Sequence, residues 1–302
     1  MPRSRYERLV TERGNRASRA LDRLTPLQIA RLMNREDQWA VRAVRRALPA
    51  VARAVDLVVT ALGRGGRLFF VGAGTSGRLG VLEAAECPPT FGTSPALVQA
   101  IMAGGRGSVF RSREGAEDDG AAAARAVRTR VRRGDVVVGV SASGVTPFVR
   151  QALKTARGRG ARTVLVLCNP TGSRPGGAQV VVALAPGPEV LAGSTRLKAG
   201  TVTKLVLNML TTATMARLGR VYGNRMVDLQ PRSAKLRERA LGLVQELAGV
   251  SRPVAARSLA AAGNRARLAI AMARTGLGAG AARRRLRTAG SLRAVIDAPR
   301  RW

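Results

Sequence analysis

Short apolar runs alternate with longer segments of helical spacing over the first two thirds of the chain. Runs of this kind are typical of buried strands, and the segments between them, such as 121–131 and 148–156, are typical of helices. The apolar runs occupy 68–71, 97–102, 135–140, 163–167 and 180–183. Because strands and helices alternate in this way, the sequence predicts an α/β fold with a doubly wound parallel sheet.

Helical patterns without strands occupy both ends of the chain. Near the N-terminus a helix is expected to begin at Pro26, and a second helical stretch is expected after Asn34, reaching about residue 62. From about residue 232 onward, segments rich in alanine, leucine and arginine follow one another between glycines. We therefore predict one domain at 1–231, formed by the sheet with an N-terminal helical extension, and a small helical domain at 232–302.

The net charge of +34 changes this picture less than its size suggests. Only four of the 52 basic residues are lysines, the arginines are scattered along the whole chain, and aromatic residues make up 3%. A surface built for nucleic acid would cluster its basic residues and would offer aromatic rings for base stacking. We therefore expect no specific nucleic-acid partner.

The residue types that are missing narrow the chemistry further. The chain has no histidine, which excludes Ser–His and Cys–His dyads and zinc sites built on imidazole. Proton transfer is then left to carboxylates, lysine, tyrosine or a thiolate. The two cysteines, Cys87 and Cys168, form no disulfide framework, and Cys87 is more typical of a core residue than of a nucleophile. With no apolar run long enough to span a bilayer, we expect a soluble cytoplasmic protein without a membrane partner.

A glycine loop between the first strand and the next helix is the first candidate site. The loop, 72–77, has the sequence GAGTSG, and the helix after it is expected to stop at Cys87-Pro88-Pro89. Backbone N–H groups in such a loop and the helix N-terminus together bind small anions. The loop matches G-x-G-x-x-G, but no acidic residue follows the second strand to hold the ribose of a dinucleotide. Besides an anion site and a dinucleotide site, the loop could also be a tight turn that binds no ligand.

Two further segments, 141–147 and 193–201, repeat the combination of glycine and hydroxyl residues before a helix. Ligands bind beyond the carboxyl ends of parallel strands, so these loops are expected to surround one phosphate with neutral donors. The simpler interpretation is routine helix capping, although a cap needs only one hydroxyl per helix. For Ser194 and Lys198 the alternative is an ordinary surface turn. The residues predicted to bind a phosphorylated ligand are Thr75, Ser76, Gly77, Ser141, Ser143, Gly144, Thr146, Ser194 and Lys198.

Carboxylates are the candidates for acid–base chemistry. Although the chain has only 18 acidic residues, four of them fall within 114–119, and Glu86 ends the helix that begins at the first loop. One interpretation of the cluster is negative charge at a helix N-terminus, which the helix dipole favours. The other is that one of these carboxylates works with Glu86 as acid and base.

Six motifs in this order resemble the N-acetylmuramic acid 6-phosphate etherase family of sugar isomerase (SIS) domain proteins. They are GAGTSGRLGVLEAAECPPTFG, REGAEDD, ASGVTPFV, CNP, GSTRLKAGTVTKLVLNML and GNRMVD. The resemblance covers nearly the whole chain and implies that Glu86 and Glu117 form the catalytic pair. In two places the chain departs from the family pattern. Val145 stands where arginine is expected in the second loop, and Ser233 stands where asparagine is expected.

The resemblance implies cleavage of the lactyl ether of N-acetylmuramic acid 6-phosphate, giving N-acetylglucosamine 6-phosphate and D-lactate. It also implies a homodimer, a role in peptidoglycan recycling, and a reaction without a metal or redox cofactor. We assign Glu86 as the acid that protonates the departing lactate and Glu117 as the base. Two alternatives keep the same phosphate loops: a non-enzymatic sugar-phosphate-binding regulator of SIS type, and an aldose–ketose isomerase.

Overall fold

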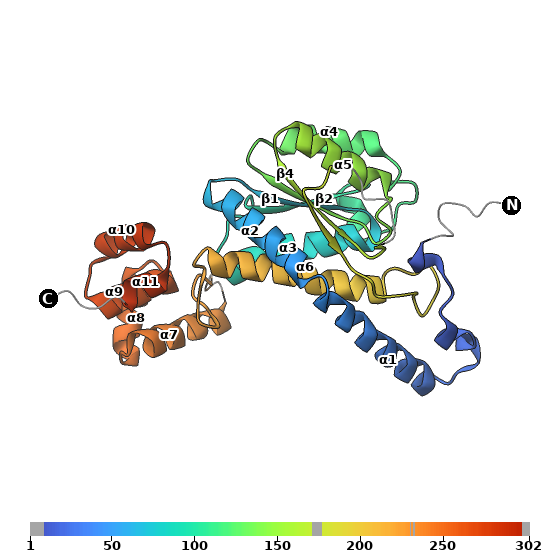
Figure 1. Cartoon of the computed structure of the whole chain (residues 1–302). Helices are drawn as coiled ribbons and strands as arrows, with labels where there is room; N and C mark the ends of the chain where they lie inside the picture. The colour runs from blue at the N-terminus through green and yellow to red at the C-terminus, as the bar shows by residue number, and fades with distance from the viewer. Residues whose placement is uncertain (1–8, 171–176, 230, 232, 298–302) are drawn as a thin grey trace. The chain divides into compact units, whose positions relative to one another are not determined.

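The computed structural model describes residues 9–170, 177–229, 231 and 233–297 (Figure 1). The chain forms two compact units. The first, called the sheet unit, comprises Met1–Ala85 and Ala96–Thr211, and the second, called the helical unit, comprises Glu86–Pro95 and Thr212–Trp302. The assignment of domains at 1–231 and 232–302 stays a prediction.

A five-stranded parallel sheet forms the centre of the sheet unit, in the order β2-β1-β3-β4-β5. This arrangement confirms the predicted fold class. Gly72 at the end of β1 lies level with Met102 of β2 and with Val140 of β3. The loops that leave β1 and β3 therefore start at the same edge of the sheet. The strands are β1 (Leu68–Gly72), β2 (Val98–Met102), β3 (Val136–Val140), β4 (Arg162–Leu167) and β5 (Val180–Ala183).

Helices cover both faces of this sheet (Figure 1). On one face, α4 (Gly120–Arg130) and α5 (Pro147–Gly158) pack on Phe69, Val71 and their neighbours. On the other face, α2 (Leu48–Gly63) packs on β5, and the first half of α3 (Gly74–Phe91) approaches β1 so closely that a side chain at Gly80 would meet Phe70. The long helix α6 (Lys198–Arg217) follows β5 along the chain. The core of this unit is accordingly formed by apolar strand residues, many of them valine, packed between alanine-rich helices.

The first N-terminal helix begins at the predicted residue, but the break between the two N-terminal helices does not lie where it was predicted. The helix α1 (Pro26–Arg45) begins where expected, with Thr25 and Gln28 forming a capping box. It continues through Asn34, whereas a second stretch was expected to start there. The break falls instead just before α2, where Pro49 occupies the first turn and cannot donate a backbone hydrogen bond. Before α1, three short 3-10 turns lie at Val10–Glu12, Arg16–Ser18 and Leu21–Arg23.

The helix α3 also extends further than predicted, because Pro88 and Pro89 lie inside it and it ends at Phe91. Both prolines fall in the last turn, where each removes one backbone hydrogen bond to an earlier carbonyl, and the buried side chains of Cys87 and Phe91 hold that turn in place. Gly92 then leaves the helix with φ of 61°, and a Cβ there would lie 2.3 Å from the Asp228 carbonyl oxygen. Glycine is required at this position for both reasons.

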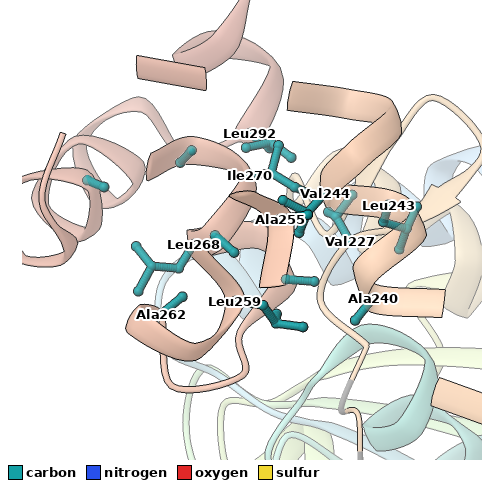
Figure 2. Close-up of a cluster of buried hydrophobic side chains, with 14 of the residues drawn as sticks. Val227, Ala240, Leu243, Val244, Ala255, Leu259, Ala262, Leu268, Ile270 and Leu292 are labelled. Atoms are coloured by element: carbon teal, nitrogen blue, oxygen red, sulfur yellow. The ribbon is translucent and has the colours of Figure 1, made fainter. Parts of the chain in front are cut away.

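The C-terminal part of the chain is helical, as the sequence predicts. Small aliphatic side chains such as Val244, Ala255 and Ile270 form its core, shown in Figure 2. A two-stranded hairpin that the sequence did not reveal, β6 (Val221–Tyr222) with β7 (Arg225–Met226), precedes the helices. The helices are α7 (Ala234–Ala248), α8 (Arg252–Ala261), α9 (Ala266–Thr275), α10 (Ala279–Ala289) and α11 (Leu292–Ile296). Within the described ranges, no helix is both long and apolar enough to cross a bilayer.

Candidate active site

The first glycine loop turns directly from β1 into α3 and places two hydroxyls in the first turn of the helix. A Cβ at Gly77 would lie 2.6 Å from the Gly72 carbonyl oxygen, and a Cβ at Gly72 would lie 2.7 Å from the Gly77 nitrogen. Only glycine fits both positions. Thr75 and Ser76 are half-buried and form no side-chain hydrogen bond with any described residue. The turn therefore presents free hydroxyls next to the N–H groups of a helix N-terminus, which is the arrangement expected of an anion site.

The second loop, after β3, has hydroxyls that bond to one another. The Ser141 Oγ atom is buried and lies 2.8 Å from Thr146 Oγ1 and 3.4 Å from Ser143 Oγ. The Gly144 amide donates to Ser141 Oγ at 3.0 Å, and the Val145 amide donates to Ser143 Oγ at 3.2 Å. Thr146 precedes α5 but makes no capping hydrogen bond. Capping of α5 by Thr146 therefore does not explain this loop.

The third segment brings the start of α6 to the first loop. A Cβ at Gly200 would lie 3.6 Å from the Thr75 methyl group. Lys198, the first residue of α6, is buried, and its Nζ atom lies 2.6 Å from Glu36 Oε2. Ser194 is half-buried, and its backbone amide donates to the Leu191 carbonyl at 3.0 Å. The structure thus gives the Lys198 ammonium group a protein partner beside the candidate site.

Two carboxylates around Lys198 have shifted pKa values in opposite directions. Burial by itself would raise the pKa of Glu36, but hydrogen bonds from Lys198 and Asn15 and the charge of Lys198 bring it below its ordinary value. Burial raises the pKa of Glu189, although Glu189 accepts hydrogen bonds from the backbone amides of Lys198 and Ala199. Asn15 also donates to the Pro188 carbonyl at 3.2 Å, so this network ties the N-terminal arm to the start of α6.

Glu117 lines a cavity of about 520 Å³ at the carboxyl edge of the sheet. The same cavity is lined by Gly74 of the first loop and by Arg78. The Glu117 carbonyl accepts a hydrogen bond from the Phe148 amide at 2.9 Å, which ties its segment to the start of α5. Its carboxylate is exposed and has no hydrogen-bond or ion-pair partner in the described part of the chain. The structure therefore brings Glu117 together with the first glycine loop and ties its backbone to α5, which begins directly after the second loop.

Glu86 lies in α3, in the segment that belongs to the helical unit. Its side chain is exposed and forms no hydrogen bond or ion pair with a described residue. Glu83, three residues earlier, behaves differently: it is buried, and its carboxylate lies 2.6 Å from Lys204 Nζ and 2.7 Å from Thr211 Oγ1. Of the two glutamates in this helix, Glu86 is the one available to a ligand.

The thiol of Cys168 is unsuited to nucleophilic chemistry. It is fully buried beside Thr203, and burial raises its pKa to about 12. Cys87 is also buried. The carboxylates are thus the accessible proton-transfer groups around the sheet edge.

Comparisons with known protein families agree with this fold. The SIS domain family matches residues 117–213, and the N-terminal SIS domain of glucokinase regulatory protein matches residues 50–157. Among solved structures, a phosphoheptose isomerase from Francisella tularensis superposes with a TM-score of 0.51 at 16% identity, covering 64% of this chain and 100% of that one. At this identity the likeness concerns the fold alone.

Curated relatives match over nearly the full length. An N-acetylmuramic acid 6-phosphate etherase from Synechocystis sp. is 49% identical over 292 residues, which is 96% of each chain. The chain belongs to the N-acetylmuramic acid 6-phosphate etherase family. A second etherase, from Rippkaea orientalis, is 52% identical over 90% of this chain and 89% of its own, and a third, from Symbiobacterium thermophilum, is 51% identical over 87% and 88%. The resemblance that the motifs indicated is confirmed.

Sequence reasoning missed three side chains that shape the candidate site of this etherase family member. Arg78 lines the cavity beside Glu117, and its guanidinium group holds the loop after β2 through the Val109 and Ser108 carbonyls at 2.8 and 3.0 Å. Glu83 joins α3 to α6, and Glu189 binds the first amides of α6. The sequence signal that could have identified Arg78 is its position in the first turn after the glycine loop. For Glu83 and Glu189, the only signal is an acidic residue within an apolar stretch of sequence.

Proposed function

We infer that this chain is an enzyme, an N-acetylmuramic acid 6-phosphate etherase. It cleaves the lactyl ether of its substrate by elimination and water addition, giving N-acetylglucosamine 6-phosphate and D-lactate. The observation that carries this inference is the match to a curated etherase at 49% identity over 96% of both chains. The activity is that of a carbon–oxygen lyase.

The substrate phosphate is held mainly by neutral donors of the two glycine loops. Thr75, Ser76 and Gly77 supply the first set, and Ser141, Ser143, Gly144 and Thr146 supply the second. Support comes from the shared sheet edge, from the free hydroxyls of Thr75 and Ser76, and from the helix N-terminus that follows them. Ser194 and Lys198, at the start of α6, complete the proposed binding set, with Lys198 also bonded to Glu36.

Two glutamates divide the proton transfers. In the open-chain sugar, the aldehyde at C1 acidifies the C2–H bond. Glu117 takes that proton, the electron pair forms the C2–C3 double bond, and the C3–O bond to lactate breaks. Glu86 gives a proton to the departing lactate oxygen. Water then adds its hydroxyl at C3 and a proton returns to C2, so the reaction requires neither a redox step nor a metal. Each acid or base role contributes roughly 10²–10⁴-fold.

The finer assignments belong to the same proposal. We place the enzyme in the cytoplasm, as a homodimer that serves peptidoglycan recycling and amino sugar catabolism. The absence of any membrane-spanning helix among the described residues is compatible with this placement.

A second candidate function is a regulator that binds a sugar phosphate without transforming it. The match of residues 50–157 to the N-terminal SIS domain of glucokinase regulatory protein supports this second candidate. Such a regulator needs the phosphate loops but has no use for an acid–base pair.

Incubation of the purified protein with N-acetylmuramic acid 6-phosphate distinguishes the two. We expect one D-lactate and one N-acetylglucosamine 6-phosphate for each substrate consumed, measured by an enzymatic lactate assay. The Glu117→Gln variant is the matched control, because it should bind the substrate in a calorimeter without releasing lactate. Saturable binding by the unaltered protein with no lactate would overturn the etherase proposal in favour of the regulator.

A further inference from the structure

The helical unit contains a concentration of arginine that the proposed etherase chemistry does not use. Two adjoining cavities, of about 590 and 320 Å³, share the lining residues Arg220, Asp228, Arg265 and Arg267. Arg283 and Arg287 of α10 complete the smaller cavity. We call these five arginines and Asp228 the arginine pocket.

Asp228 is the one carboxylate among the residues that line this pocket. The Asp228 Oδ2 atom lies 3.1 Å from Arg267 Nη1 and 3.5 Å from Arg220 Nη1. Arg267 also donates to the Gly290 carbonyl at 3.1 Å, while its buried Nε atom has no acceptor among the described residues. Asp228 therefore accounts for two of the arginines and satisfies neither of them completely.

The other three arginines have no partner of opposite charge. Arg265, Arg283 and Arg287 are exposed, and none forms an ion pair or a side-chain hydrogen bond within the part of the chain that the structure describes. Five positive charges against one negative charge leave a surplus at a concave surface, where like charges repel one another. A bound anion with more than one negative charge would relieve that repulsion.

The geometry also indicates what kind of anion fits. Guanidinium groups bind phosphate oxygens through two parallel hydrogen bonds, so several of them around one hollow suit a multiply charged phosphorylated molecule. Among the residues of this unit that the structure describes, no aromatic ring is free to stack on nucleic-acid bases: Phe91 is buried, and Tyr222 bonds to Asp297 with Arg293 lying over its ring. A small oxyanion therefore matches the pocket better than a nucleic acid does.

We propose that the arginine pocket of the helical unit is a second anion site, which binds a small, multiply charged phosphate compound. Every residue that lines this pocket belongs to the helical unit, whereas every residue of the phosphate loops belongs to the sheet unit. This site would give a function to some of the arginine residues, whose scatter along the chain indicated no specific partner.

Calorimetric titration of the full chain with inorganic pyrophosphate, at about 0.15 M salt, tests the proposal. The Arg283→Gln/Arg287→Gln variant should weaken binding by at least about tenfold, as expected for the loss of charge-assisted hydrogen bonds. The matched control is Arg284→Gln/Arg285→Gln, which removes the same charge from the same helix at exposed residues outside both cavities. The control should change the affinity by less than about twofold.

Two additional variants keep the outcome decisive. Arg265→Gln should weaken pyrophosphate binding on its own. Because Arg265 is exposed, an unchanged circular dichroism spectrum would exclude misfolding as the cause of the weaker binding. Ser76→Ala/Ser143→Ala, in the phosphate loops, should leave pyrophosphate binding at the pocket intact. The proposal is overturned if binding is not saturable, if the pocket and control variants lose affinity equally, or if only the loop variant loses it. Tighter binding of an oligothymidylate that depends on Arg283 and Arg287 would also overturn it, because the pocket would then serve nucleic acid.

Discussion

The sheet unit and the helical unit differ in how they balance their charges. In the sheet unit each buried carboxylate has a cation of its own or backbone donors: Asp135 pairs with Arg67 at 2.7 Å and Glu83 with Lys204 at 2.6 Å. In the helical unit, Asp228 is the one carboxylate lining the arginine pocket, and it pairs with two of the five arginines. Where the protein neutralises a charge itself, that charge holds elements together. Where it leaves a surplus, the charge is available to a ligand.

The pairs of the sheet unit join segments that are far apart in sequence. Asp135 is 68 positions from Arg67, Glu83 is 121 from Lys204, and Glu36 is 162 from Lys198. Each pair therefore fixes the position of one element against another within the sheet unit. The carboxylates of Glu86 and Glu117 are exposed and lie outside this pattern, as the proposal that they act on a substrate requires.

The largest expected effect concerns Asp135. Its carboxylate is fully buried and accepts hydrogen bonds from the Arg67 side chain and from the backbone amides of Arg67 and Arg132. Asp135→Ala leaves these donors without an acceptor and should lower the free energy of unfolding by about 3–5 kcal/mol. In the helical unit, Glu246→Ala breaks an exposed pair with Arg225 and should cost less than about 1 kcal/mol. Urea denaturation measures both, and equal losses would contradict the comparison.

The next effect separates the two candidate glutamates. Glu86→Gln and Glu117→Gln should each lower turnover by at least roughly 10²-fold while leaving the unfolding free energy nearly unchanged, because both side chains are exposed. In deuterated water, Glu86→Gln should still exchange the C2 hydrogen without releasing lactate, whereas Glu117→Gln should not. Mass spectrometry of recovered substrate measures the exchange.

Glu83→Gln is the control for the same helix, because Glu83 is buried and paired with Lys204. It should lower stability without abolishing C2 exchange. If the exchange results for Glu86 and Glu117 are reversed, their roles are swapped, and full activity of both variants would contradict the mechanism.

Much of the sheet unit could be predicted from the sequence, for a physical reason. Strands β1 and β3 are buried on both faces and so appear as continuous apolar runs, and the first two hydroxyl loops follow them directly at the carboxyl edge. The continuation of α3 through Pro88 and Pro89 could not be predicted, because buried contacts of Cys87 and Phe91 override a local signal.

The ion-pair partners of individual charged residues could not be predicted from local sequence patterns either. Lys198 appeared as a rare lysine near a helix start, and its pairing with Glu36 depends on how the N-terminal helix folds back. The arginine pocket was hidden for another reason, since arginine is frequent everywhere in the chain and only the fold shows which side chains converge. The assignments of Glu86, Glu117 and the loop residues to substrate stay predictions.

The Glu36–Lys198 pair should make the stability of the sheet unit depend on pH. The pKa of Glu36 is lowered in the folded state, so its contribution is present above its ordinary value of 4.5 and is lost as pH falls through the lowered value. Glu36→Gln should therefore cost about 2 kcal/mol of unfolding free energy at pH 7, and the difference from the unaltered protein should shrink below pH 4.5. For comparison, Glu238→Gln removes an exposed pair with Arg252 and should cost less than about 1 kcal/mol at either pH. A pH-independent difference for Glu36→Gln would show that the pair contributes no charge interaction.

A double variant in the phosphate loops tests the proposal that the sheet unit holds the substrate phosphate mainly through neutral donors. Ser76→Ala/Ser143→Ala should raise KM for N-acetylmuramic acid 6-phosphate by about tenfold or more, equivalent to about 1.4 kcal/mol, with a smaller change in kcat. Ser194→Ala is a useful companion, since it removes a hydroxyl from the third segment only. An unchanged KM in the double variant would mean that the phosphate is bound elsewhere.

The smallest expected effect probes the surplus charge of the helical unit directly. Asp228 is the carboxylate that offsets part of the arginine pocket, and it competes with an incoming anion for Arg220 and Arg267. Asp228→Asn keeps an acceptor of the same size while removing the negative charge, so pyrophosphate affinity should rise by roughly two- to fivefold. Glu246→Gln removes the same charge outside the pocket and should leave the affinity unchanged. A fall in affinity for Asp228→Asn would mean that this carboxylate orders the arginines for binding rather than competing with the ligand, and the contrast between the two units would then lose its basis.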